Sequence, residues 1–315
     1  MIEVKHLTKR YGSHCAVDDI SFSVDEGEIL GFLGPNGAGK STTMNILTGY
    51  LSATDGTVTI NGHDILEEPN EAKANIGYLP EIPPLYPDMT VREYLDFMYD
   101  LKKCILPRVK HITEICKVMK IEDVYGRLIK NLSKGYKQRV GMAQALIGNP
   151  PVLILDEPTV GLDPNQIIEM RGLIKSLGKH HTVILSSHIL PEIEAVCDRV
   201  VIINTGKIVA DDTAENLSAR FSEDRRLLVS VAGPAKETAE LIASIPGVVS
   251  VQSMGSREAG AEEFAVEIEA GADIRRDLFD RLSKRSWPLL ASKPLSMSLE
   301  DIFISLTMRQ NGGVQ

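Results

Sequence analysis

The sequence, 315 residues long, has no apolar run that approaches the length of a membrane-spanning helix, which is about 20 residues. Apolar stretches such as Val152–Leu155 and Val200–Ile203 have instead the length of buried strands. The segment Met1–Leu7 carries an acidic residue and lacks the apolar core of a secretory signal, so we expect no such signal. Any work at a membrane is therefore expected to depend on another polypeptide.

Cysteine is scarce, and its spacing gives no sign of a Cys-x-x-Cys motif or of a zinc finger. The four cysteines are Cys15, Cys104, Cys116 and Cys197. They form no Cys-x-x-Cys pair, and no histidine stands at zinc-finger spacing from them. We interpret them as buried or idle thiols in a reducing compartment, which favours a cytoplasmic location.

The sequence also lacks an excess of positive charge. Its 43 acidic residues outnumber the 34 basic ones and give a net charge of −9. A mildly acidic chain has no general attraction to nucleic acid or to anionic lipid. We therefore expect no nucleic-acid partner.

What the sequence does contain is the pattern of an α/β protein. Hydrophobic residues make up 43% and charged residues 24%, which is typical of a soluble globular protein. Short apolar strands alternate with helical stretches, and this alternation predicts a mostly parallel sheet flanked by helices. We expect a main domain over residues 1–220, with a helical subdomain at about 82–147, where apolar residues recur every three or four positions.

The composition shifts near Phe221. Residues 221–308 read as a strand, a helix, two strands, a helix, a strand and a last helix, and the β-α-β-β-α-β order is the ferredoxin-like arrangement. Because this part contains no cluster of chemically able groups, we interpret it as a small α+β accessory domain with a regulatory or dimer-supporting role. The polar end, residues 309–315, is expected to be a flexible tail.

A glycine-rich loop carries the strongest chemical signal. Residues 34–41 read GPNGAGKS, which fits G-x-x-x-x-G-K-[ST] between an apolar strand and a helical stretch. The glycines allow backbone N–H groups to turn toward one point, and the following helix N-terminus adds positive partial charge there. Lys40 is expected to reach the β- and γ-phosphates of a nucleotide, and Ser41 is expected to bind Mg²⁺. The strand–loop–helix context makes an ordinary glycine turn a weak alternative.

Two adjacent carboxylates, Asp156 and Glu157, end a second apolar strand. Since a strand alternates its side chains, the two cannot perform the same task. We expect Asp156 to hold Mg²⁺ through water and Glu157 to polarise the attacking water. Solvated acids at a strand end are the alternative.

His188 follows a third apolar strand, and open parallel sheets bind ligands at the carboxyl ends of their strands. A neutral imidazole at this place can bind a γ-phosphate and orient the water. A histidine after two serines can also be no more than the neighbour of a helix N-cap, and the residue alone does not decide between these readings.

These motifs occur together in one order along the chain. The phosphate loop is followed by NLSKGYKQR at 131–139, LDEP at 155–158, GLDP at 161–164 and SH at 187–188. In this combination the first 220 residues resemble an ATP-binding-cassette (ABC) ATPase. The resemblance implies a head-to-tail dimer that sandwiches two ATP molecules, each between the phosphate loop of one subunit and the signature helix of the other.

The resemblance also implies roles for single residues. It makes Ser133 and Gly135 the contacts to the γ-phosphate held by the opposite subunit, Tyr11 the aromatic side chain that stacks on adenine, and Asp163 part of the loop that links the two sites. A helix that opens at Ser133 independently offers a hydroxyl and free N–H groups to an anion. The expected nucleotide-binding residues are Tyr11, Gly34, Pro35, Asn36, Gly37, Ala38, Gly39, Lys40, Ser41, Thr42, Ser133, Gly135 and Asp163, with Ser41, Glu81 and Asp156 expected at Mg²⁺ and Glu157 and His188 expected to be catalytic.

The sequence departs from the family pattern at two places. Lys134 and Tyr136 stand where the signature usually has glycine and glutamine, and Lys134 either adds a cation near the opposite phosphate or points to solvent. Glu81 stands where the family has a glutamine that touches Mg²⁺ and senses the transporter; it can still bind the metal, and it adds a charge. Both departures, with the C-terminal domain, resemble the stand-alone ATPase subunits of multidrug-type and gliding-type bacterial exporters, whose permease is a separate chain.

The sequence therefore predicts the ATP-hydrolysing motor subunit of an ABC transporter, using ATP and Mg²⁺ and driving export. The implied partners are an integral-membrane permease, engaged by a groove near Glu81–Pro87, and a second ATPase subunit that is expected to be another copy of this chain. The expected location is cytoplasmic, peripheral on the inner face of the cell membrane. A soluble ABC ATPase that remodels a cytoplasmic assembly is the alternative, although the chain has one cassette and no sustained heptads.

Overall fold

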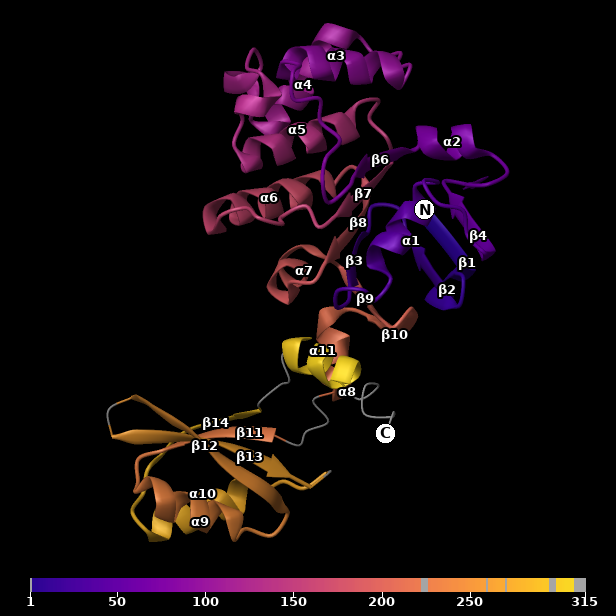
Figure 1. Cartoon of the computed structure of the whole chain (residues 1–315). Helices are drawn as coiled ribbons and strands as arrows, with labels where there is room; N and C mark the ends of the chain where they lie inside the picture. The colour runs from indigo at the N-terminus through magenta and orange to yellow at the C-terminus, as the bar shows by residue number, and fades with distance from the viewer. Residues whose placement is uncertain (1, 222–225, 259, 270, 295–298, 309–315) are drawn as a thin grey trace. The chain divides into compact units, whose positions relative to one another are not determined.

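The computed structural model describes residues 2–221, 226–258, 260–269, 271–294 and 299–308 (Figure 1). The chain divides into two compact units: the first runs to Ala214 and takes in the chain from Leu306 on, and the second is Glu215–Ser305. Each unit has its own buried apolar core. Within the described residues, no helix combines the length and the apolarity that crossing a bilayer requires.

A six-stranded sheet forms the centre of the first unit. Its order is β10-β9-β3-β8-β7-β6, and every neighbouring pair except β10–β9 is parallel. The strands are β3 (Ile29–Leu33), β6 (Ile76–Leu79), β7 (Val152–Asp156), β8 (Thr182–Ser187), β9 (Arg199–Asn204) and β10 (Lys207–Asp212). Every residue of β3, β7 and β8 is buried, because both faces of a parallel sheet are covered. The predicted mostly parallel sheet is confirmed.

A second, antiparallel sheet packs against this one. It has the order β2-β1-β4-β5. Its strands are β1 (Ile2–Tyr11), β2 (His14–Val24), β4 (Asp55–Ile60) and β5 (His63–Asp64). Phe22 of β2 meets Phe32 of β3 with ring centroids 5.5 Å apart, and Met44 and Leu47 of α1 (Lys40–Leu47) are buried in the same core. The core thereby fixes the start of α1 relative to the end of β1.

Helices cover the sheet and build a separate helical group. The helices are α2 (Pro69–Ala74), α3 (Val91–Leu101), α4 (Arg108–Met119), α5 (Lys134–Leu146), α6 (Pro164–Leu177) and α7 (Leu190–Val196), with single turns η1 (Glu122–Val124) and η2 (Ile129–Asn131). Helices α3, α4 and α5 pack on one another (Figure 1). Thr90 and Glu93 begin α3 with reciprocal side-chain to backbone hydrogen bonds, a capping box that stops the helix from fraying.

The second unit has the predicted order of elements. They are β11 (Arg226–Val231), α9 (Ala235–Ala243), β12 (Val248–Glu258), β13 (Ala261–Ile268), α10 (Arg275–Lys284) and β14 (Leu289–Pro294), with α8 (Ala214–Phe221) before and α11 (Leu299–Met308) after them. The four strands form an antiparallel sheet in the order β12-β13-β11-β14. Val229, Phe264 and Leu278 are fully buried in its core. The tail predicted at 309–315 lies outside the described residues.

Two edge strands, β6 and β10, are not among the predicted strands. Strand β6 has four residues, one of them a glycine, and therefore gives a weak signal. Strand β10 returns from β9 through Thr205 and Gly206, both with positive φ, as a two-residue hairpin turn requires. A β-branched threonine rarely adopts this conformation, so the sequence offers little turn signal there.

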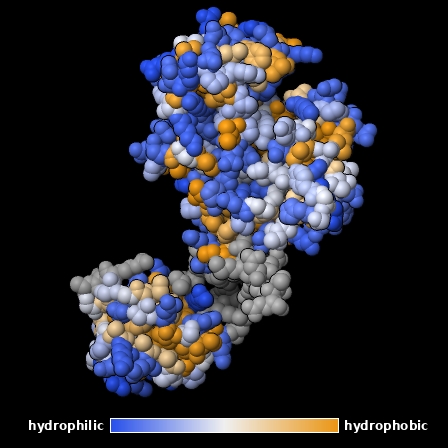
Figure 2. All heavy atoms as spheres, in the orientation of Figure 1, coloured by the Kyte–Doolittle hydropathy of each residue, from blue (hydrophilic) through white to orange (hydrophobic). Residues whose placement is uncertain are grey.

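The visible surface of the first unit is mainly hydrophilic, as expected when most apolar side chains lie in the core. On the face seen in Figure 2, hydrophilic residues predominate and hydrophobic side chains appear in small scattered patches. Single exposed apolar residues are common on soluble folds and need no partner to explain them.

Candidate active site

A cleft opens where the carboxyl ends of β3, β7 and β8 meet at one edge of the sheet. Its volume is about 590 Å³. The residues that line it are Tyr11, His14, Ala16, Asn36, Gly37, Gly39, Lys40, Ser41, Thr42, Glu81, Glu157, Val160 and His188. Parts of the sequence as distant as β1 and the loop after β8 therefore share one hollow, at the sheet edge where such folds bind ligands.

The loop between β3 and α1 builds one wall of the cleft. Gly39 precedes α1 with φ of 111°, and a Cβ at this position would lie 2.6 Å from the Ala16 carbonyl oxygen, so only glycine fits. Lys40 begins the helix with a side chain that is 6% exposed, and its Nζ donates to the Gly34 carbonyl oxygen at 2.7 Å. The buried ammonium and the positive end of the helix dipole together favour a phosphate group here.

Glu157 lies just beyond β7 and turns its carboxylate into the cleft. Its backbone is left-handed (φ 48°), a conformation that costs a non-glycine residue roughly 1–3 kcal/mol. The N–H of Glu157 donates to Ser186 Oγ at 3.0 Å, which ties the strained residue to β8. The side chain is 7% exposed, and its Oε1 lies 3.6 Å from Lys40 Nζ.

His188 completes the same group of side chains. Its Nδ1 lies 2.9 Å from Glu157 Oε2 and 3.0 Å from Oε1. Because an ionised carboxylate only accepts hydrogen bonds, this network assigns the proton to Nδ1. The imidazole is 43% exposed and keeps its second nitrogen available to a ligand. The contact joins residues 31 positions apart, and strand order, not local sequence, creates it.

Asp156 and Glu157 occupy different environments, as predicted, but not through strand alternation alone. Asp156 is the last residue of β7 and is 3% exposed, and its Oδ1 accepts from Ser186 Oγ. It lies outside the residues that line the cleft. Glu157 differs because it follows the strand with a left-handed backbone.

The oxygen donors of the cleft suit a magnesium ion that arrives with phosphates. Ser41 and Glu81 line the cleft, and Asp156 is buried at the end of β7, next to Glu157 in the sequence. Across the described part of the chain, no three His, Cys, Asp or Glu side chains are grouped to hold a metal by themselves. Mg²⁺ is commonly bound by one or two carboxylates together with substrate phosphates, and this donor set fits that mode.

Six expected nucleotide contacts are not among the residues that line the cleft. Gly34, Pro35 and Ala38 still belong to the loop that forms its wall, whereas Ser133, Gly135 and Asp163 lie elsewhere. Ser133 is the N-cap of α5, where its Oγ accepts from Tyr136 N at 3.3 Å. Asp163 is the N-cap of α6, where it accepts from Gln166 N at 3.0 Å. The two helix starts touch, because a Cβ at Gly135 would lie 2.8 Å from the Gln166 amide. Ser133 and Asp163 are exposed and Gly135 is buried against Gln166, and the chain's own cleft includes none of the three.

The two unusual signature residues contact neighbouring parts of the chain. Lys134 Nζ lies against Gly161 in the loop before α6. Tyr136 donates its hydroxyl to Asp123 Oδ2 at 2.6 Å, and this hydrogen bond raises the pKa of Tyr136 above its ordinary value.

Several cleft residues are not predicted from the sequence. His14, Ala16 and Val160 line the cleft and carry no motif of their own. Ser186 holds both Asp156 and Glu157, because the register of β7 and β8 places it beside Asp156. Only the strand pairing could have identified it.

Comparison with known proteins agrees with this geometry. The sequence profile of the family described as ABC transporter matches residues 17–160. The chain is 40% identical over 222 residues to the bacitracin transport ATP-binding protein BcrA of Bacillus licheniformis, covering 70% of this chain and 72% of that one. It is 33% identical over 319 residues to the linearmycin resistance ATP-binding protein LnrL of Bacillus subtilis, covering 98% and 99% of the two chains.

Solved structures give the same result. An ATP-binding subunit of an ABC transporter matches with a TM-score of 0.65 and 31% identity, covering 70% of this chain and 93% of that chain. A dimeric ATP-binding cassette in a post-hydrolysis state, bound to ADP and Pi, matches with a TM-score of 0.62 and 26% identity over 68% and 98% of the two chains. With its phosphate loop, paired carboxylates and sheet order, the chain belongs to the ABC transporter family and is one of its ATP-binding subunits, an ATPase.

Proposed function

We propose that this chain is the motor subunit of an ABC exporter and that two copies close around two Mg-ATP molecules. One observation carries the proposal: Lys40, Glu157 and His188, from three separate parts of the sequence, meet in one cleft. A buried lysine supplies positive charge for phosphates, and a carboxylate beside an imidazole can polarise a water molecule. The relatives named for bacitracin transport and linearmycin resistance support the export of a compound by this chain's transporter.

We assign tasks to the phosphate loop, Tyr11, Glu157 and His188. The loop of residues 34–42 and the Lys40 ammonium bind the phosphates, while Tyr11, 47% exposed at the end of β1, stacks on the adenine. Glu157 polarises the attacking water. His188 donates from Nδ1 to the Glu157 carboxylate, and in the imidazolium form, with a proton on each nitrogen, it also donates from Nε2 to the γ-phosphate.

Mg²⁺ is assigned to the oxygen donors of the same cleft. Ser41, Glu81 and Asp156 are the residues that would hold it, directly or through water. When bound, the ion neutralises negative charge on the phosphates.

The second copy supplies the contacts that the cleft lacks. Ser133 and Gly135, at the start of α5, are proposed to bind the γ-phosphate held by the other copy, and Asp163 to link the two sites. The exposure of Ser133 and Asp163 outside the chain's own cleft supports this arrangement. The start of α5, like the start of α1, favours an anion because of its free N–H groups and the positive end of the helix dipole.

Replacing Ser133 with arginine is expected to block the ATP-driven dimer and leave ATP binding by the single chain intact. The added side chain fills the surface that the second nucleotide must approach, whereas Lys40 and its loop are untouched. Light scattering with Mg-ATP measures the dimer in the Glu157→Gln background. Ser176→Arg, at an exposed serine near the far end of α6, is the matched control. A normal ATP dimer in Ser133→Arg contradicts the sandwich.

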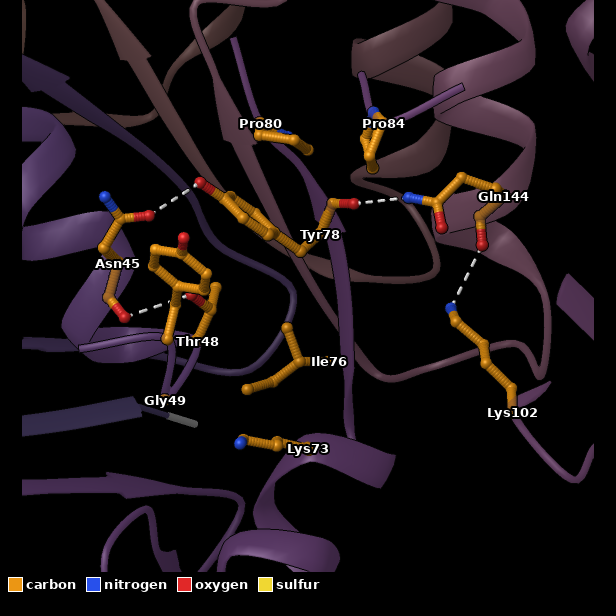
Figure 3. A pocket seen from close by; sticks show the side chains of 11 residues that line it. Asn45, Thr48, Gly49, Lys73, Ile76, Tyr78, Pro80, Pro84, Lys102 and Gln144 are labelled. Carbon is orange, nitrogen blue, oxygen red and sulfur yellow. Dashed lines mark hydrogen bonds between the residues drawn. The ribbon is translucent and has the colours of Figure 1, made fainter. Parts of the chain in front are cut away.

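A second hollow, here called the groove, lies between α1 and β6 on one side and the ends of α3 and α5 on the other (Figure 3). Its volume is about 570 Å³ and its lining is mostly apolar. The lining residues are Asn45, Thr48, Gly49, Tyr50, Lys73, Ile76, Tyr78, Pro80, Pro84, Lys102 and Gln144. Tyr50 stands at this groove with 79% of its surface exposed.

Hydrogen bonds connect the walls of the groove (Figure 3). Tyr78 donates its hydroxyl to Asn45 Oδ1 at 3.2 Å, and Gln144 Nε2 donates to the Tyr78 carbonyl at 2.7 Å. Lys102 Nζ donates at 3.0–3.2 Å to three carbonyls near the C-terminal end of α5. Burial lowers the pKa of Lys102 to about 8. Helix α1, strand β6 and helix α5 are therefore fastened together at this point.

We infer that the groove receives a cytoplasmic segment of an integral-membrane permease. Tyr78 at the groove and Glu81 at the nucleotide cleft are three residues apart on one stretch of chain. This shared segment supports a coupling between docking and hydrolysis. The proposed location is accordingly the inner face of the cell membrane, where the chain is held through the permease.

Affinity capture from the native host tests this role. The tagged Glu157→Gln chain, with Mg-ATP, is extracted from membranes in mild detergent, and the co-purifying chains are identified by mass spectrometry. We expect a membrane protein with several spans in stoichiometric amount. Recovery only with ribosomal or other cytoplasmic assemblies would overturn the transporter role in favour of a soluble ABC ATPase.

Replacing Tyr50 with glutamate is expected to lower recovery of the permease by at least ~10-fold, because a charge in an apolar interface is costly and a buried tyrosine often dominates binding. Its side chain is exposed in the free chain, so folding is not at stake. Val249→Glu, at an exposed apolar residue of the second unit, is the control. Equal recovery of the permease by the two variants would exclude the groove as the docking site.

A further inference from the structure

A buried carboxylate lies directly behind the catalytic pair and has no part in the roles assigned so far. Glu192, on α7, is 3% exposed. Its Oε2 accepts from Thr159 Oγ1 at 2.5 Å and from Ser187 Oγ at 3.1 Å. Its Oε1 has no hydrogen-bond partner, and none of the ion pairs found in the described part of the chain includes it.

The two hydroxyls belong to the segments that carry Glu157 and His188: Thr159 lies in the loop after β7, and Ser187 is the last residue of β8. Thr159 is two residues past Glu157, in a turn where Val160 N donates to the Glu157 carbonyl at 3.2 Å. Ser187 immediately precedes His188, and its Oγ accepts from Ile189 N at 3.0 Å. A single oxygen atom of Glu192 thus accepts hydrogen bonds from both segments.

This fastening is separate from the hydrogen bonds of the strands. Ser186 already joins Glu157 to the end of β8, on the side of the strands. Glu192 makes a second connection, from Thr159 in the loop after Glu157 to Ser187 at the end of β8. Burial of a carboxylate whose hydrogen-bond donors are all neutral costs free energy of folding. An apolar side chain would fill the same space at a lower free-energy cost. Its presence at this place therefore indicates a task in the site.

We propose that Glu192 is a positioning residue for ATP hydrolysis: it holds the Thr159 loop to the end of β8 at Ser187, so that Glu157 and His188 keep their contact. The proposal rests on the roles proposed for Glu157 and His188. A general base must be held within hydrogen-bond reach of its partner, and a displacement of about 1 Å is enough to lower the rate about 100-fold. Glu192 touches neither the nucleotide nor the water and acts only through these two segments.

Two variants of similar size separate hydrogen bonding from packing. In Glu192→Gln, the amide oxygen takes the place of Oε2 and still accepts hydrogen bonds. The amide nitrogen takes the place of the unpartnered Oε1. Glu192→Met keeps the volume and removes the acceptor. In the full-length chain with Mg-ATP, we expect Glu192→Met to lower kcat about 10- to 100-fold with KM for ATP within about twofold, and Glu192→Gln to stay within about threefold of the parent.

The hydroxyls provide a second test that leaves Glu192 in place. Thr159→Val and Ser187→Ala each remove one donor and are expected to lower kcat in the same direction. Thr159→Val added to Glu192→Met is expected to cause little further loss, because the link is already broken. This series remains informative if Glu192→Met alone does not fold.

Several outcomes would overturn the proposal. They are full kcat in Glu192→Met, equal damage by glutamine and methionine, and a fall in kcat that only follows the fraction of chain able to bind ATP. Glu157→Gln is measured alongside. If that variant keeps normal turnover, the proposed site fails, whereas slow turnover in Glu157→Gln with full activity in Glu192→Met rejects the positioning role alone.

Discussion

Replacing Lys40 with alanine is expected to weaken ATP binding by at least ~100-fold. The Lys40 side chain is 6% exposed and is held by the Gly34 carbonyl, so its ammonium is already placed where phosphates bind. Each hydrogen bond to a charged group contributes about 1.5–3 kcal/mol, and two such bonds exceed the ~2.7 kcal/mol that a 100-fold change in affinity requires. The loop keeps its shape in the variant, because Gly39 and the start of α1 set the backbone.

Titration calorimetry with ATP measures this loss directly. Lys110→Ala, at an exposed lysine on α4, is the matched control, since it removes one positive charge from the same unit at a distance from the cleft. Thermal unfolding of both variants shows whether the fold is intact. An unchanged affinity for ATP in Lys40→Ala would mean that the loop does not bind the phosphates.

Glu157→Gln is expected to bind ATP and to hydrolyse it at least ~100-fold more slowly, in the range for loss of a general base. Glutamine has the size of glutamate and can keep an oxygen facing His188 and Lys40. Its amide has lost the negative charge that polarises a water molecule. The variant therefore separates binding from chemistry and should accumulate as the ATP-bound dimer.

Release of phosphate in a single turnover is the measurement for Glu157→Gln. Glu194→Gln, at an exposed glutamate on α7, removes an equivalent charge close by and should hydrolyse ATP at the parent rate. Hydrolysis near the parent rate in Glu157→Gln would place the base elsewhere. His188, which contacts Glu157, is then the first residue to replace.

The central architecture could be predicted because its signals are local. Runs of buried residues such as Ile29–Leu33 and Val152–Asp156 are typical of central parallel strands, and the phosphate loop follows one of them. Glu157 and His188 each directly follow a strand, and Lys40 follows the loop that leaves a third strand. Parallel strands bring such ends to one edge, so a shared cleft follows from the sequence pattern.

The contacts between strand ends could not be predicted in this way. Ser186 meets Asp156 only because β8 pairs with β7 in one register, and Glu192 meets Thr159 only because α7 packs behind that pair. The touching starts of α5 and α6, where Gln166 meets Gly135, depend equally on how two helices pack. Such contacts arise from the folded arrangement, whereas sequence patterns report the neighbours along the chain.

The short path from the groove to the cleft has a thermodynamic consequence. From Tyr78 to Glu81 the chain spans at most about 10 Å, and Pro80 restricts its backbone, so little slack can absorb a shift at either end. The proposed coupling between the two hollows then has to obey linkage: any factor by which an occupant of the groove changes the affinity for ATP is the factor by which ATP changes the affinity for that occupant. A docking segment that tightens the binding of ATP more than that of ADP must itself be bound more firmly before hydrolysis and released more readily after it.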